Sequence, residues 1–159
     1  MTVIEIDGMY SGINFSACHF IPHHEKCSRL HGHGYIMRLR LEGEIGKDGM
    51  VMDFVVLKKK LREMAEEMDH RVLVPSRSDI VKVSTEGKTV KISFTGKEYA
   101  FPLSDVKFLD VPTTTAEEMS KMMAERIVKE VNFPKNIRSV SVGLDEERGQ
   151  TAWSEVVLK

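Results

Sequence analysis

Two alternating segments near the start of the chain constrain its fold more than any other feature. Residues 13–19 (INFSACH) and residues 31–42 (HGHGYIMRLRLE) both alternate with a period of two, which is typical of β-strands. Side chains two apart on a strand point to the same face, so His31 and His33 project together with Cα atoms roughly 6–7 Å apart. His19 lies in phase with the apolar positions of the first segment. If the two strands pair antiparallel, all three imidazoles converge on one face of a sheet.

Three converging histidines without an evident fourth protein ligand are typical of a catalytic zinc site, because one coordination position stays open for water or substrate. Gly32 and Gly34 flank His33 and support this interpretation, since glycine weakens a strand unless a close backbone approach requires it. A His-x-His pair on a strand also arises by chance, so a histidine cluster that binds no metal stays an open alternative.

Cys27 lies four residues before His31, in an irregular segment that leads into the second strand. As a fourth zinc ligand, Cys27 would close the site and make it structural. As a free thiol beside a divalent cation, it would have a lowered pKa and would serve as a base or a nucleophile. The spacing alone does not distinguish these two roles.

Asp69 and His70 stand at the end of a predicted helix and form a candidate acid–base pair. A carboxylate near an imidazole raises the basicity of the ring and fixes its tautomer. The alternative is a surface histidine that the carboxyl end of the helix favours on its own.

The remaining pattern predicts an α+β fold with an antiparallel sheet and helices on one face. A helix over residues 54–68 follows from apolar residues at 3.6-residue spacing, with Asp53 as its N-cap. Thr114 and Glu117 match a capping box that opens a second helix. The predicted strands are, in chain order, residues 3–7, 13–19, 31–42, 50–53, 139–144 and 151–158.

Length and composition restrict the domain organisation and the classes of function. The chain of 159 residues is interpreted as a single domain, 1–159, in which residues 75–112 form a β-hairpin-rich insertion. The net charge of −1 and the lack of a basic stripe argue against nucleic acid as a partner. No apolar run is long enough to span a membrane. Acidic residues near the N-terminus, where a secretory signal would be basic, predict a cytoplasmic protein.

Together these motifs resemble the 6-pyruvoyltetrahydropterin synthase / 6-carboxytetrahydropterin synthase family. The most specific element is Cys-x-x-x-His-Gly-His at residues 27–33 with His19 upstream. The matching segments occur in family order and span nearly the whole chain outside the insertion. Besides the Cys-x-x-x-His-Gly-His element, the matching segments are residues 15–19 (FSACH), 50–54 (MVMDF), 68–70 (MDH) and 112–117 (PTTTAE), together with Glu146 and Trp153.

The resemblance implies a T-fold, in which a four-stranded antiparallel sheet carries two helices on one face. Such subunits form trimers that stack into homohexamers, with active sites at subunit boundaries. By the same resemblance, Zn²⁺ would be bound by His19, His31 and His33. Catalysis would use Cys27 as the base, with Asp69 and His70 as an acid–base relay from across a subunit interface, and the pterin would be bound by Thr115, Glu117 and Glu146.

The reaction implied is that of a zinc-dependent lyase acting on a small molecule, 7,8-dihydroneopterin triphosphate. The gap of three residues between Cys27 and His31 resembles the branch that forms 6-carboxytetrahydropterin, acetaldehyde and triphosphate on the route to 7-deazaguanine (queuosine and archaeosine) precursors. The runner-up is a 6-pyruvoyltetrahydropterin synthase, which eliminates triphosphate without cleaving the side chain. An alternative from another functional class also stays open: a binding domain without turnover that is stabilised by zinc, with Cys27 as the fourth zinc ligand.

Overall fold

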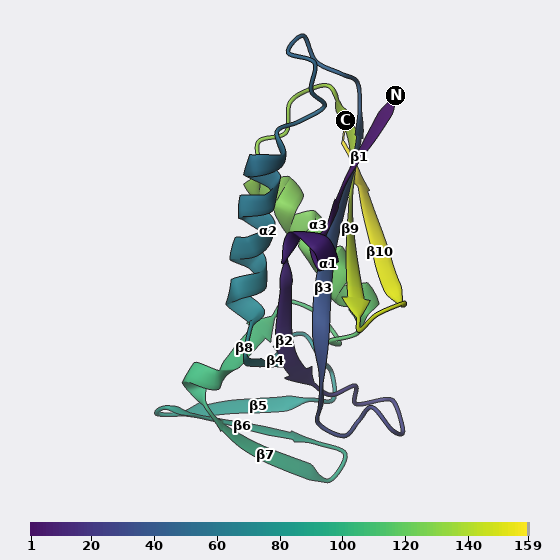
Figure 1. Cartoon of the computed structure of the whole chain (residues 1–159). Helices are drawn as coiled ribbons and strands as arrows, with labels where there is room; N and C mark the ends of the chain where they lie inside the picture. Colours follow the sequence, from purple (N-terminus) through teal and green to yellow (C-terminus); the bar gives the residue numbers. More distant parts are fainter. Residues whose placement is uncertain (159) are drawn as a thin grey trace.

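The computed structural model describes residues 1–158 as one main sheet, two long helices and a smaller second sheet (Figure 1). The long helices are α2 (Phe54–Met68) and α3 (Ala116–Glu130), and α1 (Gly8–Ser11) is a single turn. The strands are β1 (Thr2–Asp7), β2 (Asn14–His19), β3 (His31–Gly43), β4 (Arg71–Pro75), β5 (Lys82–Glu86), β6 (Thr89–Phe94), β7 (Lys97–Pro102), β8 (Val106–Leu109), β9 (Ile137–Glu146) and β10 (Thr151–Val157), with a 3₁₀ turn at Leu103–Asp105.

The main sheet is built on four antiparallel strands in the order β10-β9-β3-β2. Three further strands extend it: β4 and β8 join in parallel beyond β2, and β1 pairs with the second half of β3. The pairing of β2 with β3 places His19 opposite His31 and Ala17 opposite His33. This is the antiparallel pairing that the alternation of the two segments predicts.

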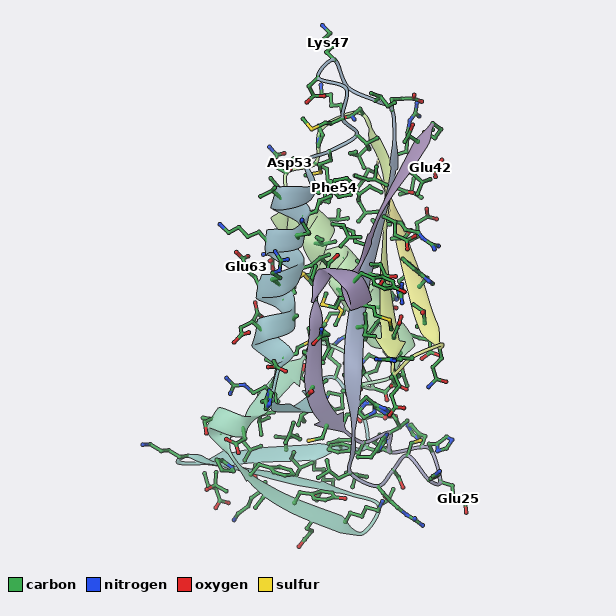
Figure 2. The ribbon with its side chains drawn as sticks, in the orientation of Figure 1. Glu25, Glu42, Lys47, Asp53, Phe54 and Glu63 are labelled. Carbon is green, nitrogen blue, oxygen red and sulfur yellow. The ribbon has the colours of Figure 1, made fainter. Side chains whose placement is uncertain are left out.

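Both long helices cover the same face of the main sheet (Figure 1). Their apolar residues recur at helical spacing and are buried against the strands, as predicted. On α2, Glu63 lies on the opposite side and points away from the sheet (Figure 2). Each large apolar side chain buried in this way contributes about 1.5–3 kcal/mol to folding. The buried helix residues are Leu57, Leu61, Met64, Ala65 and Met68 of α2, and Met119, Met123, Ala124 and Ile127 of α3. Within residues 1–158, no helix combines the length and apolar character that crossing a bilayer demands.

The strand predicted at residues 50–53 is wrong. This segment is a bend that leads into α2, and its backbone is bound by a side chain instead of a strand: Asn136 Nδ2 donates to Val51 O at 3.0 Å and to Glu44 O at 2.7 Å. The predicted cap of α2 is confirmed, because Asp53 accepts a hydrogen bond from Val55 N at 2.8 Å.

The capping box predicted at Thr114 and Glu117 is wrong, because α3 begins one residue later than this box requires. Thr115, not Thr114, is the N-cap, and its hydroxyl accepts from Glu118 N at 3.4 Å. Thr114 is fully buried and its hydroxyl donates to Phe20 O at 3.2 Å. Adjacent threonines can both cap a helix, so the sequence does not show which one turns inward.

The segment predicted as an insertion, residues 75–112, serves two structural purposes. Residues 82–102 form the separate antiparallel sheet β5-β6-β7, as the hairpin signals predict. Its apolar side, together with Phe20 and β4, forms a second hydrophobic core. The last part of the segment, β8, belongs to the main sheet, where it pairs with β4. The segment is therefore tied into the domain at both ends.

An ion-pair cluster joins α2, α3 and β8 and gives a prediction for acid stability. Arg126 donates to both carboxylate oxygens of Glu67, at 2.6 and 2.8 Å, and Lys107 Nζ donates to the same group at 2.9 Å. The Arg126 contact, helped by Lys107, lowers the pKa of Glu67 to about 2 from its ordinary value of 4.5. A depressed carboxyl pKa stabilises the fold above pH 4.5, and this contribution is lost as the pH falls towards 2.

We therefore expect Glu67→Gln to lower the free energy of unfolding by about 1 kcal/mol at neutral pH, a figure reduced for the solvent exposure of the pair. Urea denaturation of both proteins between neutral pH and pH 3 measures the difference, which should shrink as the pH falls. Glu66→Gln, the exposed neighbour, is the matched control. A destabilisation that stays constant with pH would contradict this account.

Candidate active site

Three histidines from β2 and β3 meet on the helix-covered face of the sheet. His19, His31 and His33 each offer one ring nitrogen, and these atoms lie within 4.8 Å of one another. Their ring centroids are 4.7–5.1 Å apart. The geometry follows from the strand register, because one cross-strand pair and one position two residues along the same strand face the same side. The predicted convergence of the three imidazoles is thus present in the structure.

Each histidine of this cluster is bound through Nδ1 to an oxygen acceptor. Such a contact makes Nδ1 the protonated nitrogen and leaves the lone pair of Nε2 available, which is the arrangement found around metal-binding histidines. The acceptors are Thr114 O for His19 at 2.8 Å, Arg29 O for His31 at 2.6 Å, and Glu147 Oε1 for His33 at 3.4 Å. The Tyr35 hydroxyl also lies 3.3 Å from His19 Nδ1.

The free nitrogens face an environment that suits a cation. His19 is 1% exposed, and burial, together with the nearby His31 and His33, lowers its pKa to about 4 even though its bond to Thr114 O opposes the shift. It is therefore neutral at neutral pH. Its Nε2 atom and that of His33 are buried without a hydrogen-bond partner in the described part of the chain. Since buried polar atoms rarely stay unpaired, these atoms fit a bound metal ion.

Asp69 and His70, the candidate acid–base pair, contact each other in the structure. His70 Nδ1 lies 2.8 Å from Asp69 Oδ2, and Asp69 Oδ1 accepts from Ser16 N at 2.8 Å. The bond from Ser16 N, together with His70, lowers the pKa of Asp69. His70 adopts a left-handed backbone (φ 55°), which costs a non-glycine residue about 1–3 kcal/mol and is typical of functional sites. The ring is therefore oriented, although it is 83% exposed.

The Asp69–His70 pair lies apart from the histidine cluster within one chain. His70 lines a hollow of about 440 Å³ together with Ser16, Gly32 and Gly34, and His33 also borders it. Ser16, Gly32 and Gly34 alternate along β2 and β3 with the residues that face the helices, so they belong to the other face of the sheet. In the described residues, no hydrogen bond or ion pair links Asp69 or His70 to the cluster. The pair is thus presented mainly on the opposite face of the β2–β3 ladder, open to solvent.

Cys27 stands in the loop between β2 and β3 and is partly buried. The metal-ligand grouping found among residues 1–158 contains the three histidines and does not include the Cys27 sulfur. Cys27 N donates to His24 Nδ1 at 2.9 Å, and Cys27 O accepts from Ile21 N at 2.7 Å. In this structure the thiol is free and its backbone is held on both sides.

Of the three residues predicted to bind the pterin ring, two line the same cavity. Glu117 and Glu146 line a cavity of about 410 Å³ beside Trp153, whereas Thr115 does not line it. Glu146 Oε1 is 3.7 Å from His19 Nε2, too far for a hydrogen bond. Burial raises the pKa of Glu146. The nearby His33 and His31 oppose this shift, whereas the charge of Glu117 adds to it. The cavity therefore places a carboxylate beside the histidine cluster.

Four contributors to the site were not predicted from the sequence. Thr114 and Arg29 act through backbone carbonyls, which carry no residue-type signal. Tyr35 gives a signal in hindsight, because it continues the phase of His31 and His33 along β3. Glu147 reaches His33 from a left-handed position in the β9–β10 turn (φ 67°), which the sequence does not reveal.

Comparison with known proteins identifies the family. The family model described as 6-pyruvoyl tetrahydropterin synthase matches residues 9–156. The chain belongs to this family. A protein of Methanocaldococcus jannaschii named "Putative 6-carboxy-5,6,7,8-tetrahydropterin synthase" is 34% identical over 154 residues, covering 94% of each chain. The 6-carboxy-5,6,7,8-tetrahydropterin synthase of Synechocystis sp. is 43% identical over 72 residues, which cover 41% of this chain and 56% of that protein.

Solved structures confirm the fold of this family member. The 6-pyruvoyltetrahydropterin synthase of Plasmodium vivax, in a form with a substituted catalytic residue, superposes with a TM-score of 0.91. It is 26% identical, and the match covers 99% of this chain and 98% of the other. The Plasmodium falciparum enzyme gives a TM-score of 0.92 at 25% identity. The predicted T-fold is therefore confirmed, and the chain belongs to a family of pterin synthases.

Proposed function

We propose that this protein is a zinc-dependent 6-carboxytetrahydropterin synthase that acts on 7,8-dihydroneopterin triphosphate. The observation that carries the proposal is the cluster of His19, His31 and His33, whose ring nitrogens lie within 4.8 Å of one another while each Nδ1 contacts an oxygen acceptor. The product assignment is supported by two relatives named for that activity, one of which covers nearly the whole chain. The pathway proposed for the product is 7-deazaguanine precursor synthesis.

The three histidines would hold Zn²⁺ and leave a position open for the substrate. When bound, zinc supplies charge stabilisation to oxygens of the substrate side chain. The protein's own contribution is orientation: the acceptors on Nδ1 fix the tautomer of each ring, and burial keeps His19 neutral and able to bind a cation.

Proton transfer is assigned to Cys27 and to the Asp69–His70 pair. Cys27, outside the cluster, would remove a carbon-bound proton from the substrate side chain. His70, oriented by Asp69 at 2.8 Å, would move protons at the neighbouring hydroxyl. Because His70 is exposed and lies mainly beyond the opposite face of the ladder, we propose that it serves the site of a neighbouring subunit in a homohexamer. The proposed location of this assembly is the cytoplasm.

The carboxylate of Glu146 would accept hydrogen bonds from the exocyclic amine and a ring N–H of the pterin, which suit its two oxygens. Glu117 lines the same cavity, while Thr115 has a capping role and stays a prediction as a pterin contact.

We expect Glu146→Gln to raise KM by about 10- to 100-fold, because hydrogen bonds to a charged acceptor are lost. Steady-state kinetics with dihydroneopterin triphosphate measures the change. Glu155→Gln, an exposed substitution on the same hairpin, is the control and should leave KM as in the wild type. An unchanged KM in Glu146→Gln would remove Glu146 from the pterin site.

The proposed function is tested by incubating zinc-loaded protein with 7,8-dihydroneopterin triphosphate and analysing the products by mass spectrometry. The expected products are 6-carboxytetrahydropterin, acetaldehyde and triphosphate. A pterin that keeps its three-carbon side chain after loss of triphosphate would instead show a 6-pyruvoyltetrahydropterin synthase. No turnover, together with tight zinc binding, would favour a zinc-stabilised binding domain.

A further inference from the structure

The loop that carries Cys27 is a compact unit closed by its own hydrogen bonds. The backbone of Cys27 is bound at both its N–H and its carbonyl. The next residue, Ser28, donates from its N–H to His24 O at 3.1 Å and from its hydroxyl to Glu25 O at 3.0 Å. Glu25 itself points outward at the far end of the loop (Figure 2). A displacement of Ser28 therefore moves the neighbouring Cys27 with it.

The small sheet β5-β6-β7 contacts this loop at two points. Phe20, fully buried where the loop begins, stacks on Phe94 with ring centroids 4.5 Å apart and an interplanar angle of 24°. Where the loop returns, Lys97 Nζ donates to Ser28 Oγ at 2.9 Å. The same ammonium group lies 5.7 Å from the centroid of the Phe94 ring. The small sheet thus contacts the chain both before and after Cys27.

The backbone of Lys97 is held by the tight hairpin between β6 and β7. It is paired with Phe94 across a two-residue turn, in which Thr95 and Gly96 have φ values of 44° and 77°. Positive φ at both turn residues matches the tight turn that follows the natural twist of a β-hairpin. The backbone of Lys97 is consequently fixed relative to Phe94 and to the core that holds Phe20.

We propose that the sheet β5-β6-β7 positions the Cys27 loop and that Lys97, through its hydrogen bond to Ser28, is the residue that does so. Lys97 is a positioning residue, because it contacts Ser28 at 2.9 Å and acts on Cys27 only through the backbone that joins the two residues. The inference rests on the proposed function in assigning catalysis to Cys27. Its physical content, the control of Cys27 reactivity by Lys97, can be measured without turnover.

The experiment measures alkylation of Cys27 by iodoacetamide and steady-state kinetics in the zinc-loaded full-length protein. A Cys18→Ala background leaves Cys27 as the single thiol, since the sequence contains two cysteines. In Lys97→Met we expect alkylation at neutral pH to change by about three- to tenfold, because the loop loses the hydrogen bond to Ser28 that fixes the position of the thiol. We expect kcat to fall by a similar factor and KM to stay within about twofold.

Control variants separate this role from general stability. Lys91→Met removes the ammonium of a lysine on the same sheet that pairs with Glu86, and it should behave as the parent protein. Lys97→Arg should reverse most of the change in alkylation rate. Ser28→Ala should reproduce part of it, and adding Ser28→Ala to Lys97→Met should cause little further change, because coupled residues are not additive.

Equal alkylation rates in Lys97→Met and Lys91→Met would overturn the proposal, as would a raised KM at unchanged kcat, which would assign Lys97 to substrate binding. If Lys97→Met does not fold, Ser28→Ala decides by the same measurements. A parent protein without turnover whose alkylation still depends on Lys97 would refute the proposed function and leave the positioning role standing.

Discussion

Cys27→Ala is expected to reduce kcat by about 10²- to 10⁴-fold, the contribution of a positioned proton-transfer group, while the protein keeps one zinc ion per chain. The reason is that the thiol lies outside the histidine cluster and its loop is held by backbone contacts that alanine retains. Steady-state kinetics and elemental analysis of the dialysed protein measure the two quantities.

Cys18→Ala is the matched control for the Cys27 substitution. Burial raises the pKa of Cys18, and its sulfur contacts Arg71 O at 3.9 Å and the second core, so it is not expected to carry the reaction. We expect its kcat to stay within about twofold of the wild type. If Cys27→Ala instead lost its zinc and unfolded, the thiol would be a structural ligand and the catalytic role would be refuted.

His31→Ala is expected to weaken zinc binding by more than about 100-fold and to abolish turnover, because two imidazoles alone cannot complete the site. His31 is a better position to substitute than His19, because His31 is only partly buried whereas His19 is buried among core residues. The fold should therefore persist. Titration with a competing zinc chelator measures the affinity, and circular dichroism checks the fold.

His23→Ala, in the exposed loop between β2 and β3, is the matched control for His31→Ala. It removes an imidazole from the same stretch of chain without touching the cluster, and zinc affinity should stay at the wild-type value. An affinity lost equally in both variants would show that the zinc ion is bound outside the predicted cluster.

The sequence predicted the parts of the site that follow from strand periodicity. His31 and His33 share a face because they are two residues apart, and His19 joins them through the register of β2 with β3. The two long helices could also be predicted from the sequence, since their buried residues recur at 3.6-residue spacing. In these elements, local pattern and tertiary burial agree, and the pattern alone is sufficient.

The remaining features depend on contacts between residues far apart in the chain. Thr114 binds His19 through its carbonyl and Phe20 through its hydroxyl, so its burial overrides the capping role that its sequence context suggests. Residues 50–53 alternate like a strand, yet Asn136 binds their backbone and no strand pairs with them. The contact of Lys97 with Ser28 joins positions 69 residues apart and has no local signature.

X-ray absorption at the zinc edge of the loaded protein decides whether three imidazoles hold zinc while the Cys27 thiol stays free, as we propose. We expect zinc to be surrounded by nitrogen and oxygen atoms at about 2.0–2.1 Å, three of them from imidazole rings. The spectrum should be unchanged in Cys27→Ala. A zinc–sulfur distance of about 2.3 Å in the wild type, lost in Cys27→Ala, would contradict the claim.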